Sequence, residues 1–129
     1  MQSDTLPFER RLGAHPLPDG RAEYRVWAPI PETVTLRVDG REHAMEDVGL
    51  GVREAVVEAA PRTDYVFVLD GASLPDPASR WQPEGIRGPS RLLDAGAFTW
   101  TDKDWVPPAV GDLVPVSYTH LTLPTTPYV

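Results

Sequence analysis

The sequence contains no cysteine, a single lysine and no long apolar run. The absence of cysteine excludes disulfides and cysteine-ligated metals, and it favours a cytoplasmic location. The net charge of −7 and the scattered arginines argue against a nucleic-acid surface, which needs clustered basic residues. No stretch approaches the roughly 18 apolar residues of a membrane span. Residues 1–12 also lack the apolar core of a secretory signal. We therefore expect neither nucleic acid nor a membrane as a partner.

Catalytic and cofactor-binding motifs are also lacking. At 129 residues the chain is too short for a catalytic barrel, which needs about 250 residues. There is no G-x-S-x-G motif and no glycine-rich phosphate loop. None of the three histidines is spaced as a metal ligand: His15, His43 and His120. The closest acidic pairs, Glu46 with Asp47 and Asp102 with Asp104, are typical of solvated turns. We therefore expect no active site, no metal and no cofactor.

Proline and glycine, by contrast, are abundant, at 15 and 10 residues. Both residues interrupt helices and central strands, so they favour short elements joined by turns. Apolar and polar side chains alternate with the period of two that is typical of strands, as at Val34, Leu36 and Val38. Asp39-Gly40 and Asp70-Gly71 are hairpin-turn signals. We expect strands at residues 24–28, 33–38, 42–46, 52–58 and 64–69, and a last strand near 97–101.

These strands predict an all-β fold, an antiparallel β-sandwich without helices. In the first strand, Tyr24, Val26 and Ala28 share one face, while Arg25 and Trp27 point the other way. A tryptophan within a strand is more often a core residue than a platform for a ligand. We therefore expect Trp27 to be buried.

Residues 74–93 form a proline-rich segment without periodicity. Loops longer than about 12–15 residues are usually functional or disordered. This segment carries apolar side chains that can be buried, so we expect it to be ordered and extended, with another surface packed against it. Trp81, between Arg80 and Gln82, is the best candidate for contact with a sugar or a neighbouring domain, and the domain contact is favoured.

Two stretches resemble known families. Tyr24–Pro29 (YRVWAP) is similar to the strand motif that opens the amino-terminal sandwich of branching, debranching and trehalose-forming enzymes of the α-amylase superfamily. That module is described as family-48-carbohydrate-binding-like. Pro75–Ser90 (PDPASRWQPEGIRGPS) resembles a stretch of the malto-oligosyltrehalose trehalohydrolases of glycoside hydrolase family 13, which reads P-D-P-A-S-R-x-Q-P-x-G-V-H-G-P-S. Arg87 stands where that family commonly has histidine, and Trp81 where it often has phenylalanine. The resemblance spans residues 8–114.

The resemblance implies an immunoglobulin-like β-sandwich of the E-set type over residues 1–112. It implies a parent enzyme that hydrolyses an α-1,4 bond by a retaining mechanism and releases trehalose from maltooligosyl trehalose. The family's catalytic residues lie on a (β/α)8 barrel of which residues 113–115 would be a stub, so we expect this fragment to be inactive. Residues 116–129 carry no charge, and the run VSYTHLTLPT at 116–125 matches one reading frame of a sequencing adapter. We therefore expect them to be a non-native tail.

The expected partner is the missing barrel, with the proline-rich segment forming much of the interface. The expected contact residues are Arg80, Trp81, Gln82, Ile86 and Arg87. We also expect an exposed apolar patch of about a few hundred Å² beside the segment, with Trp81, Ile86 and Leu92 not all buried in the sandwich.

Two alternatives remain open at this point. A glycogen- or starch-binding module of a branching or debranching enzyme would contact α-glucan through exposed aromatic residues, and a solvent-accessible Trp27 would favour it. A protein-interaction sandwich unrelated to sugars would show the same strand pattern.

Overall fold

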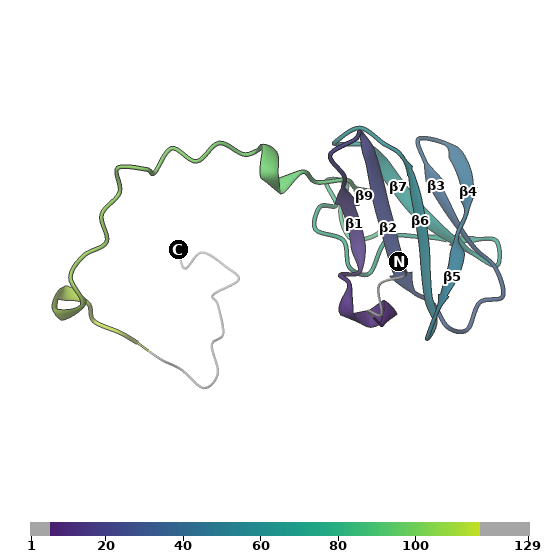
Figure 1. Ribbon diagram of the computed structural model, residues 1–129, viewed down its shortest axis with the longest axis horizontal. Coiled ribbons are helices and arrows are strands. Elements are labelled where there is room, and N and C mark those ends of the chain that lie inside the picture. The colour runs from purple at the N-terminus through teal and green to yellow at the C-terminus, as the bar shows by residue number, and fades with distance from the viewer. Residues whose placement is uncertain (1–5, 117–129) are drawn as a thin grey trace, which may run out of the picture. The chain divides into compact units, whose positions relative to one another are not determined.

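The computed structural model describes residues 6–116, and Figure 1 shows its strands. The chain divides into two compact units, one ending at Phe98 and one beginning at Thr99. All described strands belong to the first unit. In the described part of the second unit, the 3-10 helix η3 (Val110–Asp112) is the regular element.

Two antiparallel sheets make up the first unit. The first sheet has the order β1-β2-β6-β5: β1 (Gly13–Pro16), β2 (Arg21–Trp27), β6 (Val52–Glu58) and β5 (Glu46–Gly49). In the second sheet, of five strands, the order is β4-β3-β7-β8: β4 (Arg41–Ala44), β3 (Val34–Val38), β7 (Asp64–Leu69) and β8 (Ala72–Leu74). The fifth strand, β9 (Ser90–Arg91), pairs with β7. The all-β sandwich is thus confirmed, and its immunoglobulin-like label stays a prediction.

Both expected hairpin turns are present. Asp39 and Gly40 join β3 to β4 with φ angles of 48° and 76°. Asp70 and Gly71 join β7 to β8 with φ angles of 46° and 90°. Two successive residues with positive φ define the tight turn whose twist matches that of paired antiparallel strands. These turns fix the register of the hairpins that they close.

The core lies between the two sheets. Tyr24 and Val26 of β2 face Leu36 of β3 and Phe67 of β7, and all four side chains are buried. The ring of Tyr65 packs edge-on against those of Tyr24 and Phe67, with centroid distances of 4.8 and 5.8 Å. Burial alternates along β3, as the period of two predicts.

Two strand predictions need correction, and three short strands were not expected. The strand expected near residues 97–101 is absent. Ala97 instead ends the 3-10 helix η2 (Ala95–Ala97), whose cap Asp94 accepts a hydrogen bond from the Gly96 amide. The strand expected at 42–46 is two strands, β4 and β5, separated by buried Met45. The short strands β1, β8 and β9 were not expected, since four, three and two residues are too few to show a period.

Residues 117–129 lie outside the described residues, and with them most of the predicted tail and His120. The predicted boundaries at residues 112 and 115 stay predictions. Within the described range, no helix is long and apolar enough to cross a membrane. The same range contains no group of three or more acidic, histidine or cysteine side chains that could hold a metal ion.

Candidate docking surface around Trp27 and the proline-rich segment

The first anchor of the proline-rich segment is the buried carboxylate of Asp76, whose residue is only 2% exposed. Its Oδ2 accepts a hydrogen bond from the Tyr65 hydroxyl at 2.7 Å, and its Oδ1 accepts one from the Ala78 amide at 2.8 Å. The Asp76 amide in turn donates to Ser90 Oγ at 3.0 Å, which joins the two ends of the segment. Close by, a Cβ added to Gly13 would lie 3.1 Å from the Ala78 carbonyl oxygen, so glycine lets β1 start against the segment.

Burial governs the protonation of this cluster. Desolvation raises the pKa of Asp76 above its ordinary value, and the hydrogen bond from Tyr65 opposes that rise. Burial also raises the pKa of Tyr65, with the Asp76 charge adding to the effect, and it raises the pKa of Tyr24 to about 12. Both tyrosines therefore stay neutral. Hydrogen bonds to the Asp76 carboxylate hold this part of the segment in place, and the Tyr65 hydroxyl is one of the donors.

The second anchor is the strand β9 and the residues around it. Arg91 donates two hydrogen bonds to the Asp64 carboxylate, at 2.5 and 3.0 Å, and this contact lowers the pKa of Asp64. Leu92 is fully buried in the core. The guanidinium carbons of Arg62 and Arg91 lie 5.9 and 5.3 Å from the centre of the half-buried Trp81 ring. The segment is ordered because it is anchored at both ends.

Four of the five expected contact residues line two separate hollows. Arg80 Nη2 donates to the Ala14 and Leu93 carbonyls at 3.1 and 3.4 Å, and Gln82 Nε2 donates to those of Ile86 and Gly88 at 3.2 and 3.4 Å. Both side chains therefore hold the backbone of the domain itself. Arg80 and Trp81 line a hollow of about 480 Å³ next to Phe98, whereas Gln82 and Ile86 line a different hollow. Ile86 is 85% exposed and Arg87 is exposed as well.

Trp27 is not a core residue, and the expectation that it is buried was wrong. Its side chain is 61% exposed on the outer face of the first sheet, opposite Tyr24 and Val26. Its indole Nε1 donates to the Leu50 carbonyl at 3.2 Å. A Cβ at Gly51 would approach the same Nε1 to 3.0 Å, so glycine is needed beside the ring. The alternation of β2 places Trp27 outside, and this local rule outweighs the general preference of tryptophan for the interior.

Two shallow hollows adjoin Trp27. The first has a volume of about 440 Å³, and its lining includes Trp27, Leu69, Leu74, Pro77 and Ile86. The second has about 250 Å³, and its lining includes Leu12, Trp27, Pro77 and Ala78. We name the apolar side chains that border the hollows the Trp27 surface: Leu12, Trp27, Leu74, Pro77 and Ile86.

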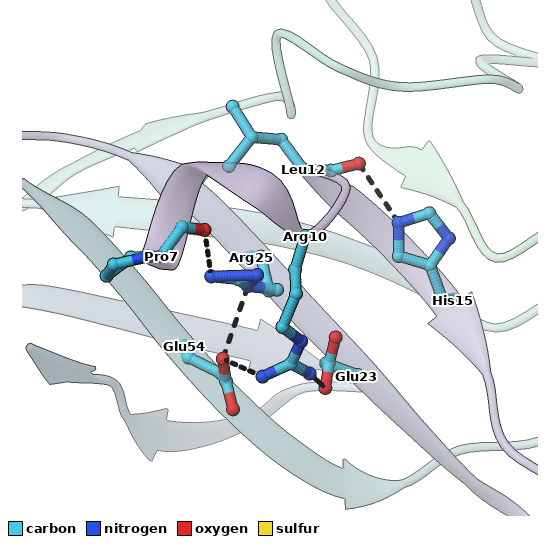
Figure 2. Close-up of polar contacts among 7 residues, drawn as sticks. All are labelled: Pro7, Arg10, Leu12, His15, Glu23, Arg25 and Glu54. Atoms are coloured by element: carbon cyan, nitrogen blue, oxygen red, sulfur yellow. Dashed lines mark hydrogen bonds and ion pairs between the residues drawn. The ribbon is translucent and has the colours of Figure 1, made fainter. Parts of the chain in front are cut away.

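A strap formed by residues 6–12 crosses the outer face of the first sheet and contributes Leu12 to this surface (Figure 2). It begins with the 3-10 helix η1 (Pro7–Glu9), whose first residue is the proline favoured there. The Leu6 amide donates to Glu9 Oε2 at 3.1 Å. The ring Nε2 of His15 contacts the Leu12 carbonyl oxygen at 3.0 Å and so holds the other end of the strap.

Charged side chains hold the strap against the sheet. Arg25 is 1% exposed beneath it, and its Nη2 donates to the Pro7 carbonyl at 2.5 Å. Glu54 Oε2 pairs with Arg25 Nε at 3.2 Å and with Arg10 Nη1 at 3.3 Å, and Arg10 also pairs with Glu23 (Figure 2). The alternation of β2 indicates that Arg25 faces outward, but no sequence signal shows that the strap buries it.

The chain is similar to enzymes of the α-amylase class. It is 45% identical over 96 residues to the malto-oligosyltrehalose trehalohydrolase of Deinococcus radiodurans, a match covering 74% of this chain and 16% of that enzyme. Over 59 residues it is 42% identical to the 1,4-alpha-glucan branching enzyme of Nocardia farcinica, covering 46% of this chain and 8% of that enzyme. The crystal structure of a Salmonella typhimurium protein assigned as an alpha amylase matches with a TM-score of 0.71 and 36% identity, covering 76% of this chain and 17% of that one.

Fold and likeness together define the class of protein: a β-sandwich domain of the α-amylase-family enzymes. Within this class, the chain is homologous to the malto-oligosyltrehalose trehalohydrolases, as the Pro75–Ser90 motif predicts. It spans 16% of the length of the first of these relatives. No model of a known protein family matches the chain.

Proposed function

We propose that this chain is the amino-terminal, non-catalytic sandwich of a malto-oligosyltrehalose trehalohydrolase and that it braces the catalytic barrel. The whole enzyme would hydrolyse an α-1,4 bond and release trehalose from maltooligosyl trehalose. Support comes from the names of the homologous enzymes and from the small share of their length that the chain spans. We place the chemistry outside the sandwich, since the buried or half-buried acidic side chains of Glu23, Asp64 and Asp76 pair with arginines or hold backbone.

The observation that carries the bracing role is the construction of the proline-rich segment. Asp76 and Leu92 tie its two ends into the buried interior, whereas Ile86 between them is 85% exposed. Proline restricts the unfolded chain, so holding this segment in one conformation costs less entropy. A contact surface that is already ordered loses little further freedom when it docks.

A direct test is the incubation of the purified chain with maltooligosyl trehalose. We expect no trehalose above the level of a buffer blank, because the chain would lack the barrel. Trehalose release that follows the protein through purification would refute the non-catalytic assignment.

A second candidate function is that of an α-glucan-binding module, and the exposed ring of Trp27 favours it. Exposed aromatic rings stack on sugar rings. Electrophoresis in gels containing glycogen or amylose separates the two functions. Retardation that is lost in Trp27→Ala and kept in Trp81→Ala would establish glucan binding, whereas equal mobility with and without the glucan would support the brace.

A further inference from the structure

The polar groups bordering the two hollows at the Trp27 surface are largely occupied within the domain. Trp27 Nε1 donates to the Leu50 carbonyl, and Gln82 Nε2 donates to two backbone carbonyls. Asp76 is the single acidic residue among those lining the hollows, and both of its carboxylate oxygens accept hydrogen bonds. Few acceptors are thus left for the hydroxyl donors that a sugar brings.

The remaining charged group in the lining lies beneath the strap. Arg25 lines the smaller hollow, and its Nη1 is buried without a hydrogen-bond partner in the described part of the chain. Because this atom is buried, an occupant of the hollow would meet the apolar side chains of Leu12, Trp27 and Pro77 instead. A peptide segment brings apolar side chains that match this lining, and the chain spans only 16% of the length of the Deinococcus radiodurans enzyme, so most of a homologous enzyme is available to supply such a segment.

We infer that the Trp27 surface is the place where an apolar peptide segment of the catalytic domain docks, with the strap forming one wall of the contact. This inference rests on the proposed bracing function. The docking face consists of Leu12 from the strap, Trp27 from β2, and Leu74, Pro77 and Ile86 from β8 and the proline-rich segment. The hollow beside Trp81 is not part of it.

The strap wall depends on the ion pairs around Glu54. Arg10 and Arg25 share Glu54 Oε2, and Arg25 also holds the Pro7 carbonyl (Figure 2). Leu12 follows directly after this anchored stretch. Removal of the Arg10 side chain should therefore loosen the strap and displace Leu12 from the wall of the smaller hollow, while the sandwich stays folded.

The test uses a chimera in which the homologous segment of the Deinococcus radiodurans enzyme is replaced by that of this chain. Ile86→Asp puts a charge into the proposed contact. Ile30→Asp is the matched control, because Ile30 is 92% exposed and lines neither hollow. We expect Ile86→Asp to lower the melting temperature of the chimera by at least about 2 °C relative to the control. In the chain by itself, both variants should melt together with the parent, which separates lost docking from misfolding.

Each other outcome has a distinct meaning. A chimera in which the sandwich unfolds independently of the catalytic part would refute the bracing function itself. A coupled chimera in which Ile86→Asp and Ile30→Asp behave alike would refute only the assignment of this face. Retardation of the chain in an amylose gel that is lost in Ile86→Asp would identify α-glucan as the occupant and overturn the inference.

Hydrogen exchange tests the strap in the chain by itself. In Arg10→Ala, the backbone amides of residues 6–12 should exchange several-fold faster than in the parent. Arg37→Ala serves as control, because Arg37 pairs with Glu42 in the second sheet, away from the strap. Unchanged exchange of residues 6–12 in Arg10→Ala would show that the ion pairs do not hold the strap.

Discussion

The ends of the proline-rich segment and its middle are built in opposite ways. At the ends, Asp76 and Leu92 are buried, and Asp76, Ser90 and Tyr65 are joined by hydrogen bonds. In the middle, Ile86 and Arg87 are exposed, and Gln82 holds the backbone of the loop through two carbonyls. The difference shows that a surface segment can be rigid without being covered. Substitutions at the buried ends should therefore change the stability of the domain, whereas substitutions in the exposed middle should change its contacts with a partner.

The largest effect is expected for Leu92→Ala at one buried end. Removing a fully buried leucine side chain leaves a cavity, and such substitutions cost about 2–5 kcal/mol of unfolding free energy. Leu74→Ala is the control, because Leu74 is 49% exposed, and it should cost clearly less. Urea unfolding followed by tryptophan fluorescence measures both. Equal losses would mean that Leu92 is not a core anchor.

Tyr65→Phe tests the other buried end and should cost about 1.5–3 kcal/mol at neutral pH, since it removes a donor to a buried carboxylate. The Tyr65 bond lowers the pKa of Asp76, so in the variant this pKa rises further above its unfolded value. A group whose pKa is raised in the folded state contributes to the free energy of unfolding in acid, and this contribution is lost as the pH rises through the folded-state pKa. The stability difference from the parent should therefore shrink as the solution is acidified. Denaturant unfolding at neutral and mildly acidic pH measures it, and a constant difference would contradict this prediction.

Asp64→Asn removes the charge that pairs with Arg91 beside the second end of the segment. It should lower the free energy of unfolding by less than Tyr65→Phe does. The Asp64 and Arg91 side chains are 35% and 27% exposed, so solvent screens the pair and we expect a loss of at most about 1 kcal/mol. Arg91 lowers the pKa of Asp64, so this contribution is present above the unfolded pKa and is lost as the pH falls through the folded-state pKa. Unfolding at low and high salt checks it. A loss that does not weaken with salt would argue for a packing role instead.

The smallest effect is expected in the exposed middle. Ile86→Asp should change the stability of the chain by no more than about 0.5 kcal/mol, because the side chain is 85% exposed. Thermal unfolding beside the Leu92→Ala variant gives the comparison directly. A loss similar to that of Leu92→Ala would remove the distinction between the ends of the segment and its middle.

Local patterns predict most of the sandwich. Val34, Leu36 and Val38 alternate in sequence and are buried together in the structure. Asp39-Gly40 and Asp70-Gly71 close hairpins because few other residue pairs accept positive φ so readily. A feature encoded by a residue and its near neighbours is therefore visible in one sequence.

The candidate site was less predictable because it depends on contacts between distant parts of the chain. Arg25 is buried by the strap, which approaches from residues 6–12, and no pattern around Arg25 shows this. Composition singles out the proline-rich segment. It does not show that two arginines lie near the ring of Trp81, or that Ile86 shares a hollow with Trp27. Such pairings follow from tertiary packing, which a single sequence does not display.

The strand order of the two sheets has a consequence for how the chain reaches this structure. The pairs β1–β2, β3–β4, β5–β6 and β7–β8 join strands that follow each other directly. By contrast, β2–β6 and β3–β7 join strands from distant parts of the chain. Closing a long loop costs entropy before the pairing of distant strands gives any stabilisation. We therefore expect the hairpins to form first and the pairings of distant strands to limit the refolding rate. Refolding times on the order of milliseconds to seconds follow from this topology, as for other sandwiches of high contact order.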